Sequence, residues 1–284
     1  MSDGAVTTQD PTPETAAATD VAAQARARTG VCIGIDIGGT GIKGAPVDLV
    51  SGQFTADRRR EPTPQPSTPE AVAVVVADIA RGFQAQMPDY DAASTPLGVT
   101  FPAVIQHGVS RTAANVHESW VGTDVEALIE GATHRPVHVV NDADAAGVAE
   151  VRFGAARGVS GVVLVATLGT GIGSALLVDG LLVPNTELGH LVVDGHDAET
   201  RAAESARERE GLSWKEWAGR LTRYFRAVEA LFWPDLIVVG GGVSKKAEKF
   251  LPLIDIRTPM VPATLRNQAG IIGAAVLAAE RRGG

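Results

Sequence analysis

The same pattern of strand, glycine turn and strand occurs twice in this chain of 284 residues, once in each half. The first copy, at 33–44, reads IGIDIGGTGIKG; the second begins with the apolar run 161–168 and continues through GTGIGS at 169–174. Glycines let a backbone adopt positive φ and approach a ligand closely, so successive N–H groups can converge on a phosphate. Two such turns at corresponding places indicate two related halves rather than one isolated glycine-rich hairpin.

Two familiar nucleotide-binding motifs do not fit the first glycine turn. Gly39, Gly41 and Gly44 have the spacing of the dinucleotide fingerprint, but that motif requires a helix after the turn. The turn is followed instead by the sequence APVDL, which favours a strand. The P-loop is excluded as well, because no Gly-Lys-Ser/Thr sequence closes the turn. The pattern therefore predicts a strand, a turn suited to phosphate and a second strand.

Composition limits the kinds of protein that the chain can be. Its 45 % hydrophobic content is enough for one large domain or two modest ones with real cores. The longest apolar run, 71–80, is interrupted by Asp78 and is far short of the roughly 20 residues of a membrane span. The N-terminus lacks the apolar segment of a secretory signal, and the single cysteine, Cys32, permits neither an internal disulfide nor a multi-thiolate zinc site. We therefore expect a cytoplasmic protein without zinc, and its net charge of −8 argues against nucleic-acid or membrane binding.

Strands and helices are predicted to alternate along the first half, as in α/β proteins. Residues 1–30, rich in Ala, Thr, Asp and Pro, form a disordered tail in this interpretation. A third strand within 53–61 extends the opening hairpin into an antiparallel meander. A helix capped by Thr68 runs to about Gln86, and buried strands follow at 97–101 and 137–140. The next helix begins after Asn141-Asp142 and reaches Phe153.

The second half is predicted to repeat this plan. An Asp-Gly turn at 179–180 joins two apolar runs into a hairpin. Apolar residues at helical spacing predict an amphipathic helix from Trp214 to Phe232, with its aromatic side chains in the core. A strand at 236–239 leads to a third glycine turn, after which Lys245, Lys246 and Lys249 open a helix. The last helix is expected from about 269 to 281.

The two glycine turns are expected to face each other across a cleft and to donate N–H groups to a phosphate chain. Phosphoryl transfer depends on positioning, charge neutralisation and a metal ion. Asp36, beside the first turn, is placed to hold Mg²⁺ directly or through water; the alternative is that it caps the turn. Lys43 either reaches the donor or points to solvent. Most other basic residues are expected on the solvated surface, with Lys245 and Lys246 the best candidates for phosphate contact.

Acidic residues at two further places suit hydroxyl chemistry. Asp142 lies where a strand ends and a helix begins, and can accept the proton of an attacking hydroxyl; the alternative is a helix N-cap. Asp144 is assigned to the first helical turn, where negative charge suits the helix dipole. Glu187 and His190 offer a carboxylate and an imidazole to sugar hydroxyls, although a lone histidine is more often a structural hydrogen-bonding residue.

Taken together, these segments resemble the ROK family of sugar kinases in the actin-like ATPase superfamily, and more narrowly the polyphosphate glucokinases within it. The resemblance covers about 34–279 and rests on IDIGGTGIKG, HGVSRTAANVHESWVGT, NDADAAG, TLGTGIGSA, PNTELGH, WPDLIVVGGGVSKKAEKF and RTPMVPATLRNQAGIIGAA in that order. It implies a ribonuclease H-like α/β fold with two similar domains around a cleft. Residues 31–142, joined by the C-terminal helix 268–284, would form the first domain, and 143–267 the second.

The resemblance also implies roles for individual residues. Asp142 matches the catalytic base, and the positions that match glucose ligands are Asn115, Asn141, Asp142, Glu187 and His190. The phosphate donor is expected at Gly38, Gly39, Thr40, Gly41, Lys43, Gly169, Thr170, Gly171, Gly173, Gly241, Gly242 and Lys245. Many ROK proteins bind zinc through a cysteine cluster together with the histidine of the ELGH motif, which is His190 here. This chain has one cysteine and departs from that pattern, so His190 is not carried over as a zinc ligand. A further sugar-binding glutamate is either Glu199 or Glu204.

The activity that the resemblance implies is phosphorylation of the 6-hydroxyl of glucose by inorganic polyphosphate, and also by ATP, with Mg²⁺ and in a homodimer. One alternative is a strictly ATP-dependent ROK hexokinase. Another is a polyphosphate or nucleotide hydrolase, against which Asn115, Glu187 and His190 argue. A sugar-sensing repressor would need a helix-turn-helix ahead of the kinase-like part, and 1–30 is too short and too poor in apolar residues to form one. Polyphosphate length preference and tolerance of mannose stay open.

Overall fold

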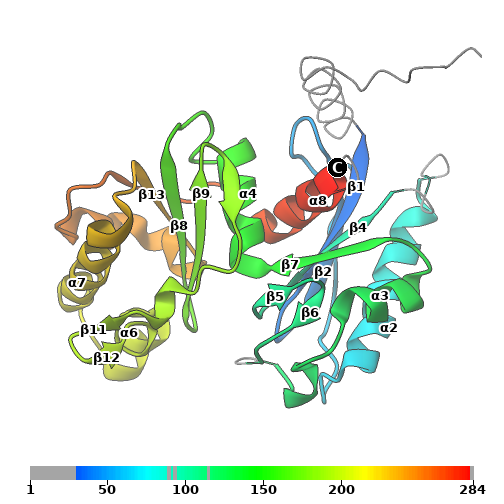
Figure 1. The fold of residues 1–284 in the computed structure, drawn as a ribbon, viewed down its shortest axis with the longest axis horizontal. Helices are drawn as coiled ribbons and strands as arrows, with labels where there is room; N and C mark the ends of the chain where they lie inside the picture. Colours follow the sequence, from blue (N-terminus) through cyan, green and yellow to red (C-terminus); the bar gives the residue numbers. More distant parts are fainter. Residues whose placement is uncertain (1–29, 88–90, 92–94, 114–115, 282–284) are drawn as a thin grey trace, which may run out of the picture.

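The computed structural model describes residues 30–87, 91, 95–113 and 116–281. Each half of the molecule contains a five-stranded sheet, and the helices α4 (Asp142–Phe153) and α8 (Ala269–Arg281) lie between the two sheets (Figure 1). Nearly all of the predicted N-terminal tail falls outside the described residues. None of the described helices is long and apolar enough to cross a membrane.

The first sheet is built around the predicted opening hairpin. Its strands in spatial order are β3 (Arg59–Glu61), β2 (Ile42–Asp48), β1 (Val31–Ile37), β4 (Leu97–Phe101) and β7 (Val137–Asn141). Strands β1, β2 and β3 form the antiparallel meander, whereas β1, β4 and β7 run parallel. The third strand is shorter than expected: Phe54 makes only an isolated bridge to Val47 and packs against the cluster beneath β2.

The second sheet repeats the order and the directions of the first. Its strands are β10 (Leu181–Val183), β9 (Ile172–Val178), β8 (Val162–Leu168), β13 (Leu236–Gly240) and β14 (Met260–Pro262). Again the opening strands are antiparallel and the last three are parallel. Even the alternation of buried and half-buried residues is the same in β1 and β8, which makes Asp36 and Thr167 equivalent positions.

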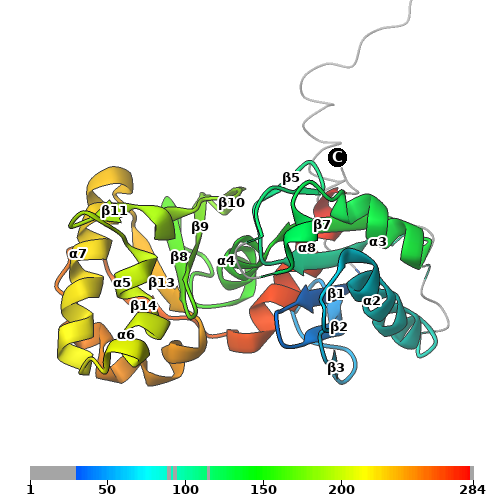
Figure 2. The ribbon, with the colours of Figure 1, turned by 90° about the horizontal axis from the view of Figure 1, so that it is seen from below.

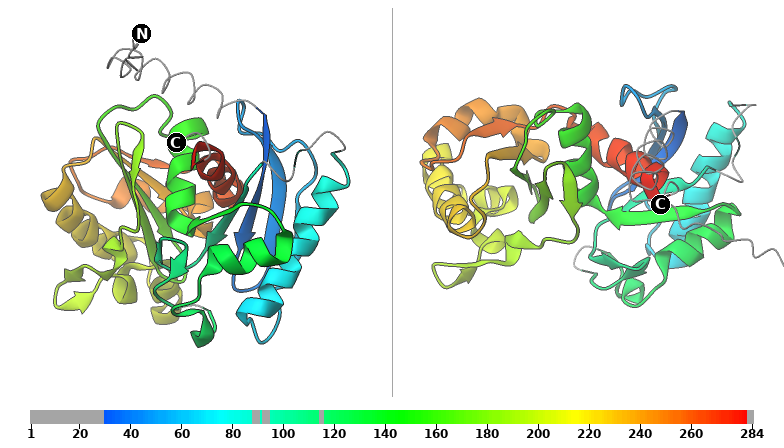
Figure 3. Two further views of the ribbon diagram at one scale, coloured as in Figure 1. Left: turned by 45° about the vertical axis from the view of Figure 1, so that its right-hand side comes forward. Right: turned by 45° about the horizontal axis from the view of Figure 1, so that its top comes forward.

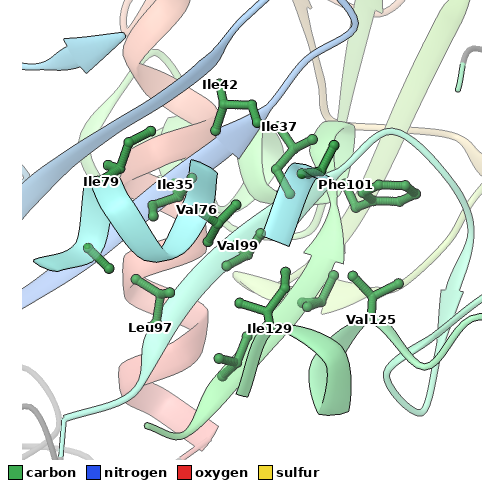
Figure 4. Close-up of a cluster of buried hydrophobic side chains, with 14 of the residues drawn as sticks. Ile35, Ile37, Ile42, Val76, Ile79, Leu97, Val99, Phe101, Val125 and Ile129 are labelled. Carbon is green, nitrogen blue, oxygen red and sulfur yellow. The ribbon is translucent and has the colours of Figure 1, made fainter. Parts of the chain in front are cut away.

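Helices α2 (Pro69–Gln84) and α3 (Val125–Thr133) cover one face of the first sheet. Thr68 caps α2 as predicted, by accepting a hydrogen bond from the Ala71 N–H, and the helix ends two residues before the expected Gln86. Ile35, Val76, Val99 and Ile129 meet in the core between these helices and the sheet (Figure 4). Each buried side chain of this size stabilises the fold by about 1.5–3 kcal/mol.

The long helix of the second half, α7 (Trp214–Phe232), has the bounds that its apolar spacing predicts. Ser213 and Glu216 form a capping box at its start. The expected core positions Trp217, Leu221 and Phe225 are fully buried. Two short helices, α5 (Glu199–Ala202) and α6 (Glu204–Glu210), connect the edge of this half to α7 (Figure 2).

Helices α4 and α8 cross over between the halves. Helix α4 follows β7 of the first sheet but packs on β8 and β9 of the second, while α8 follows β14 and packs on β1 and β4. Glycines allow the close approach: a Cβ at Gly34 would lie 2.0 Å from the Ile271 carbonyl oxygen, and one at Gly273 would lie 1.8 Å from that of Ala145. Figure 3 shows the two helices together at the junction, so the N-terminus of α4 lies where the halves meet.

Short elements complete the two halves. They are the strands β5 (Ile105–Gln106), β6 (Val109–Ser110), β11 (Val192–Val193) and β12 (His196–Asp197), and the 3₁₀ helices Glu118–Trp120, Leu188–His190, Gly242–Lys249, Leu251–Leu253 and Arg266–Gln268. Lys245, Lys246 and Lys249 lie within the third of these 3₁₀ helices and do not open an α-helix as predicted. The backbone of Lys246, with φ of −118° and ψ of 25°, is not helical and interrupts the segment, which therefore forms 3₁₀ turns.

Candidate functional site

Asn141 and Asp142 occupy the junction between β7 and α4, where Asn141 caps the helix and Asp142 leaves its carboxylate largely free. Asn141 is the N-cap: its Oδ1 accepts hydrogen bonds from the N–H groups of Ala143 (2.8 Å) and Asp144 (3.2 Å), and its Nδ2 donates to the Ala103 carbonyl (3.1 Å). The alternative that Asp142 is merely the N-cap is therefore wrong. The Asp142 side chain is exposed, and Oδ1 accepts one bond, from the Ala143 N–H at 2.9 Å.

The Asp142 carboxyl has the electrostatic environment of a proton acceptor. Although the side chain reaches solvent, the surrounding protein displaces much of its water and raises its pKa to about 6, with further contributions from the charges of Asp36 and Glu187. Such a group is ionised at neutral pH and is still basic enough to accept a proton. Asp36 comes from the first sheet and Glu187 from the second half, so charges in both halves raise the pKa of Asp142.

The first glycine turn is closed by hydrogen bonds of its own. The Gly38 N–H donates to the Gly41 carbonyl (3.2 Å), and the Thr63 hydroxyl donates to the Gly38 carbonyl (2.5 Å). The Arg60 guanidinium lies against Gly41, where a Cβ would approach its Nε to 2.9 Å. A cation therefore lies beside the loop that was expected to bind phosphate.

Asp36 makes its hydrogen bonds away from the turn, so the capping alternative is not observed. Its Oδ1 accepts from the Thr100 hydroxyl at 2.8 Å, and its Oδ2 lies 3.4 Å from Lys43 Nζ. Lys43 thus pairs with Asp36 rather than pointing freely to solvent, and its contact with the donor stays a prediction. Since that contact is long, Oδ2 keeps lone pairs that can accept from the water shell of Mg²⁺ or bind the ion, and the residue fits the predicted metal role.

The second glycine turn is held by the start of α6 and lies next to α4. Gly169 N–H donates to the Gly171 carbonyl (3.0 Å), and Ser205 donates from its hydroxyl to the Thr170 carbonyl (2.6 Å). A Cβ at Gly173 would lie 2.9 Å from that of Ala143, so this loop touches the first turn of the helix that carries Asp142.

The third glycine turn packs on the second. Gly241 has a φ of +84°, and a Cβ there would meet the Leu168 carbonyl oxygen at 2.1 Å. Lys245 is exposed after this turn, whereas Lys246 and Lys249 lie 6.0 and 5.8 Å from the Trp214 ring. Among the three lysines, Lys245 keeps its proposed donor role on position alone.

Glu187, His190 and Glu199 lie together on the second half, where Glu199 contacts the second glycine turn. The His190 Nδ1 forms a 2.8 Å hydrogen bond with Asp197 Oδ2, which raises the histidine pKa, and burial raises the pKa of Glu187. Glu199 Oε2 accepts from the Ile172 N–H at 3.1 Å. Of the two glutamates left open by the sequence, Glu199 lies with His190, whereas Glu204 lies 3.9 Å from a Cβ placed on Gly242.

Asp197 was missed by the sequence interpretation. It reaches His190 because the hairpin of β11 and β12 folds the chain back on itself, and a separation of seven residues gives no signal of this in the sequence. One ligand atom from each of His190, Asp197 and Glu199 lies within 4.8 Å of the others, a grouping that could also hold a metal ion. His190 and Asp197 already bond to each other, and the Glu199 carboxylate already bonds to the second glycine turn.

Two predicted residues fall elsewhere. Asn115 lies outside the described residues, so its predicted sugar contact stays a prediction. Asp144 is 2 % exposed, and its Oδ2 accepts from the Asn185 N–H at 2.8 Å. Burial first, and then the charges of Glu187 and Asp142, raise its pKa to about 7. The residue is therefore partly uncharged at neutral pH and ties α4 to a loop, a role beyond the helix-dipole effect that the sequence suggested.

Comparison with known proteins identifies relatives across most of the chain. The family model described as "ROK family" matches residues 32–202. Polyphosphate glucokinase from Mycobacterium tuberculosis (strain CDC 1551 / Oshkosh) is 50 % identical over 244 residues, which cover 86 % of this chain and 89 % of that protein. The one from Mycobacterium leprae (strain TN) is 47 % identical over 266 residues, covering 93 % and 79 %.

The fold has a similarly extensive match among solved structures. Inorganic polyphosphate/ATP-glucomannokinase from Arthrobacter sp. strain KM superposes with a TM-score of 0.83 and 59 % identity, covering 89 % of this chain and all of that one (100 %). This similarity, with the two matching sheets, confirms the predicted actin-like α/β fold.

Proposed function

The chain belongs to the ROK family, and on that premise we propose that it transfers a phosphoryl group from inorganic polyphosphate, or from ATP, to the 6-hydroxyl of glucose. Relatives at about half identity are polyphosphate glucokinases, and the Arthrobacter protein uses polyphosphate or ATP. One observation of this molecule carries the proposal: Asp142, with a pKa of about 6, lies at the junction of the halves and next to the second glycine loop.

In the proposed reaction, Asp142 accepts the proton of the glucose 6-hydroxyl as its oxygen attacks the terminal phosphorus of the donor. The bond from that phosphorus to the rest of the donor chain breaks, and the shortened polyphosphate or ADP leaves. The glycine turns at 38–41, 169–173 and 241–242, with Thr40, Lys43, Thr170 and Lys245, hold the donor through N–H groups and cations. Closure of the two domains, 31–142 with 268–284 and 143–267, excludes water.

The sugar is proposed to lie against Asn141, Glu187, His190 and Glu199, with Asn115 completing the site. The Asn141 Oδ1 already accepts from the N–H groups of Ala143 and Asp144. One of its two Nδ2 protons is donated to the Ala103 carbonyl, and the other is left for a sugar hydroxyl. His190, protonated over a wider pH range because Asp197 accepts from its Nδ1, can donate from Nε2. The carboxylates of Glu187 and Glu199 would accept hydrogen bonds from sugar hydroxyls.

Asp36 is the proposed metal-binding residue, directly or through water. Bound there, Mg²⁺ supplies positive charge to the negative donor. Lys43 and Arg60 lie on the same side and add fixed positive charge near the first turn. We propose that zinc has no part in the site, because the single cysteine, Cys32, is buried in β1 and cannot form the multi-thiolate cluster that binds zinc in many ROK proteins.

The setting of the protein is also part of the proposal. We propose a cytoplasmic enzyme, and its net charge of −8 argues against binding to nucleic acid or to an anionic membrane. We further propose a homodimer, as in many similar kinases. Light scattering of the purified protein measures this directly, and a molecular mass of one chain would contradict it.

A matrix of donors and acceptors tests the proposed activity. Glucose, mannose, fructose and no sugar are each combined with ATP, with short and long polyphosphate, and with Mg²⁺, and both sugar phosphate and free phosphate are measured. The expected result is glucose phosphate with polyphosphate in reactions that hold no ATP. Product with ATP alone would favour the strictly ATP-dependent hexokinase, and phosphate release without sugar would favour the hydrolase.

A further inference from the structure

Asn185 joins the two halves through both ends of its side-chain amide. Its Oδ1 accepts from the Ile105 N–H at 2.9 Å, and its Nδ2 donates to the Ile105 carbonyl at 2.8 Å. Ile105 belongs to β5 of the first half and is 8 % exposed, whereas Asn185 follows β10 of the second half. The side chain therefore pairs with the backbone of Ile105 as a neighbouring strand would.

The backbone of Asn185 makes a third connection, to the helix that carries Asp142. Its N–H donates to Asp144 Oδ2 at 2.8 Å, and Asp144 is 2 % exposed in the first turn of α4. In the same turn, Asn141 donates to the Ala103 carbonyl, two residues before Ile105. The loop 103–105 is thus held from α4 by Asn141 and from the second half by Asn185.

The position of Asn185 in the chain links this junction to the proposed sugar site. It lies two residues before Glu187 and five before His190. Its φ of +57° is in the left-handed region, which Asn tolerates better than most residues. The two hydrogen bonds between the Asn185 amide and the Ile105 backbone, called the fork below, act together with the left-handed backbone and the bond to Asp144. They fix the start of the segment that presents both candidate sugar ligands.

From these contacts we infer that Asn185 is a positioning residue, which holds the segment 185–190 against the β5 loop and the first turn of α4 and so sets the distance between Asp142 and the sugar-binding side chains. The inference rests on the proposed function for its consequence, glucose binding, but its structural content is independent of it. Loss of the fork should weaken glucose binding, because the free protein would no longer hold Glu187 and His190 in place.

Two substitutions separate this role from a general effect on folding. Asn185→Gly keeps the left-handed backbone and removes the amide, and we expect it to raise the glucose Kd roughly 10- to 30-fold, as loss of two hydrogen bonds predicts. The Km for polyphosphate should change less than about twofold, since the fork does not touch the glycine turns. Asp179→Gly is the matched control: Asp179 also has positive φ (+49°) and one side-chain hydrogen bond, to Gly161 N–H, within the second half alone.

Asn185→Asp supplies a signature that a purely structural role would not give. A protonated aspartic acid has one acceptor and one O–H donor in the same fork, whereas the carboxylate cannot donate to the Ile105 carbonyl. Asp144 of α4 accepts from the backbone N–H of this residue, and Glu187 lies two positions along the same segment; negative charge on either favours the protonated form of the new aspartate. The ratio of glucose Kd between this variant and the unsubstituted protein should therefore fall toward one from pH 8 to pH 5.

Hydrogen exchange of the Ile105 amide completes the test in the absence of any substrate. In Asn185→Gly, exchange at this amide should be at least about tenfold faster, with no change in Asp179→Gly. Unchanged exchange, or a Kd ratio for Asn185→Asp that does not depend on pH, would overturn the inference. If the unsubstituted protein phosphorylates no glucose while the exchange result holds, the proposed function fails and the positioning role stands.

Discussion

The two halves of the molecule share a scaffold and differ in the side chains at equivalent positions. In the first half, the position before the end of β1 is Asp36 and its cross-strand partner is Lys43. In the second half the corresponding pair is Thr167 and Gly173. One hairpin thus presents an ion pair beside its glycine turn, and the other presents a hydroxyl and no side chain.

This difference separates two tasks that a symmetric scaffold would share. A Cβ at Gly173 would lie 2.5 Å from the Thr167 hydroxyl and 2.9 Å from the Ala143 Cβ, so the bare position leaves room for the start of α4. In the proposed reaction, the charges of the first half serve the donor and the metal. The second half accommodates the helix that carries Asp142 and supplies the proposed sugar-binding segment. The two glycine turns therefore share a backbone plan and differ at this pair of positions.

The largest expected effect comes from the residue at which the two halves meet. Asp142→Asn keeps size and polarity but removes the proton acceptor, and kcat should fall by roughly 10²- to 10⁴-fold. Glucose binding, measured by titration calorimetry, should stay within a few-fold because the amide still offers hydrogen bonds. A near-normal kcat in this variant would end the general-base assignment.

The next effect tests the inequality of the hairpins. Asp36→Asn should lower kcat/KM for the donor roughly 10- to 100-fold and raise the Mg²⁺ concentration needed for half activity, since bonds to charged groups contribute about 1.5–3 kcal/mol. Thr167→Val, the equivalent change in the second half, should cost at most about threefold. Equal losses in the two variants would mean that the halves treat the donor alike.

The pH profile distinguishes the base from the sugar ligands. Because the pKa of Asp142 is raised to about 6, the carboxylate becomes protonated below that pH, and kcat/KM should fall roughly tenfold per pH unit there. The hydrogen bond with Asp197 raises the pKa of His190, so this ring should lose its proton at a higher pH than an ordinary histidine, and glucose affinity should decline as it does. The pKa of Asp144 is also raised, to about 7, so this residue needs a control. Asp144→Asn keeps an acceptor for the Asn185 N–H, and the loss of activity at acid pH should persist in this variant. If that loss disappears, the acid limb of the profile belongs to Asp144 and not to Asp142.

The smallest expected effect concerns the cation beside the first glycine turn. Arg60→Met should raise the Km for polyphosphate roughly two- to fivefold at low salt, and the difference should shrink as added salt screens the exposed charge. Arg58→Met is the matched control, because this exposed arginine does not lie against Gly41. Equal effects in the two variants would reduce Arg60 to a general contribution to surface charge.

The sequence predicts the fold well because its signals are local. The hairpins, the cap at Thr68 and the apolar spacing of α7 each depend on residues close together in the chain. The pairing of glycine turns also follows from repetition alone.

Contacts between distant residues could not be predicted in this way. Asp197 reaches His190 only through a hairpin, and Asn185 reaches Ile105 across 80 positions. The choice between Glu199 and Glu204 likewise depends on how two short helices turn. In each of these three cases the role of the residue depends on a tertiary contact. The neighbouring residues in the sequence look like those of an ordinary polar loop.

One measurement tests the central claim most directly. Phosphorus NMR of the protein with glucose, long-chain polyphosphate and Mg²⁺, without nucleotide, should show a growing phosphomonoester signal split into a triplet by the two protons on carbon 6. Asp142→Asn under the same conditions should show almost none. Growth of orthophosphate alone, or a doublet from a ring hydroxyl, would contradict the account.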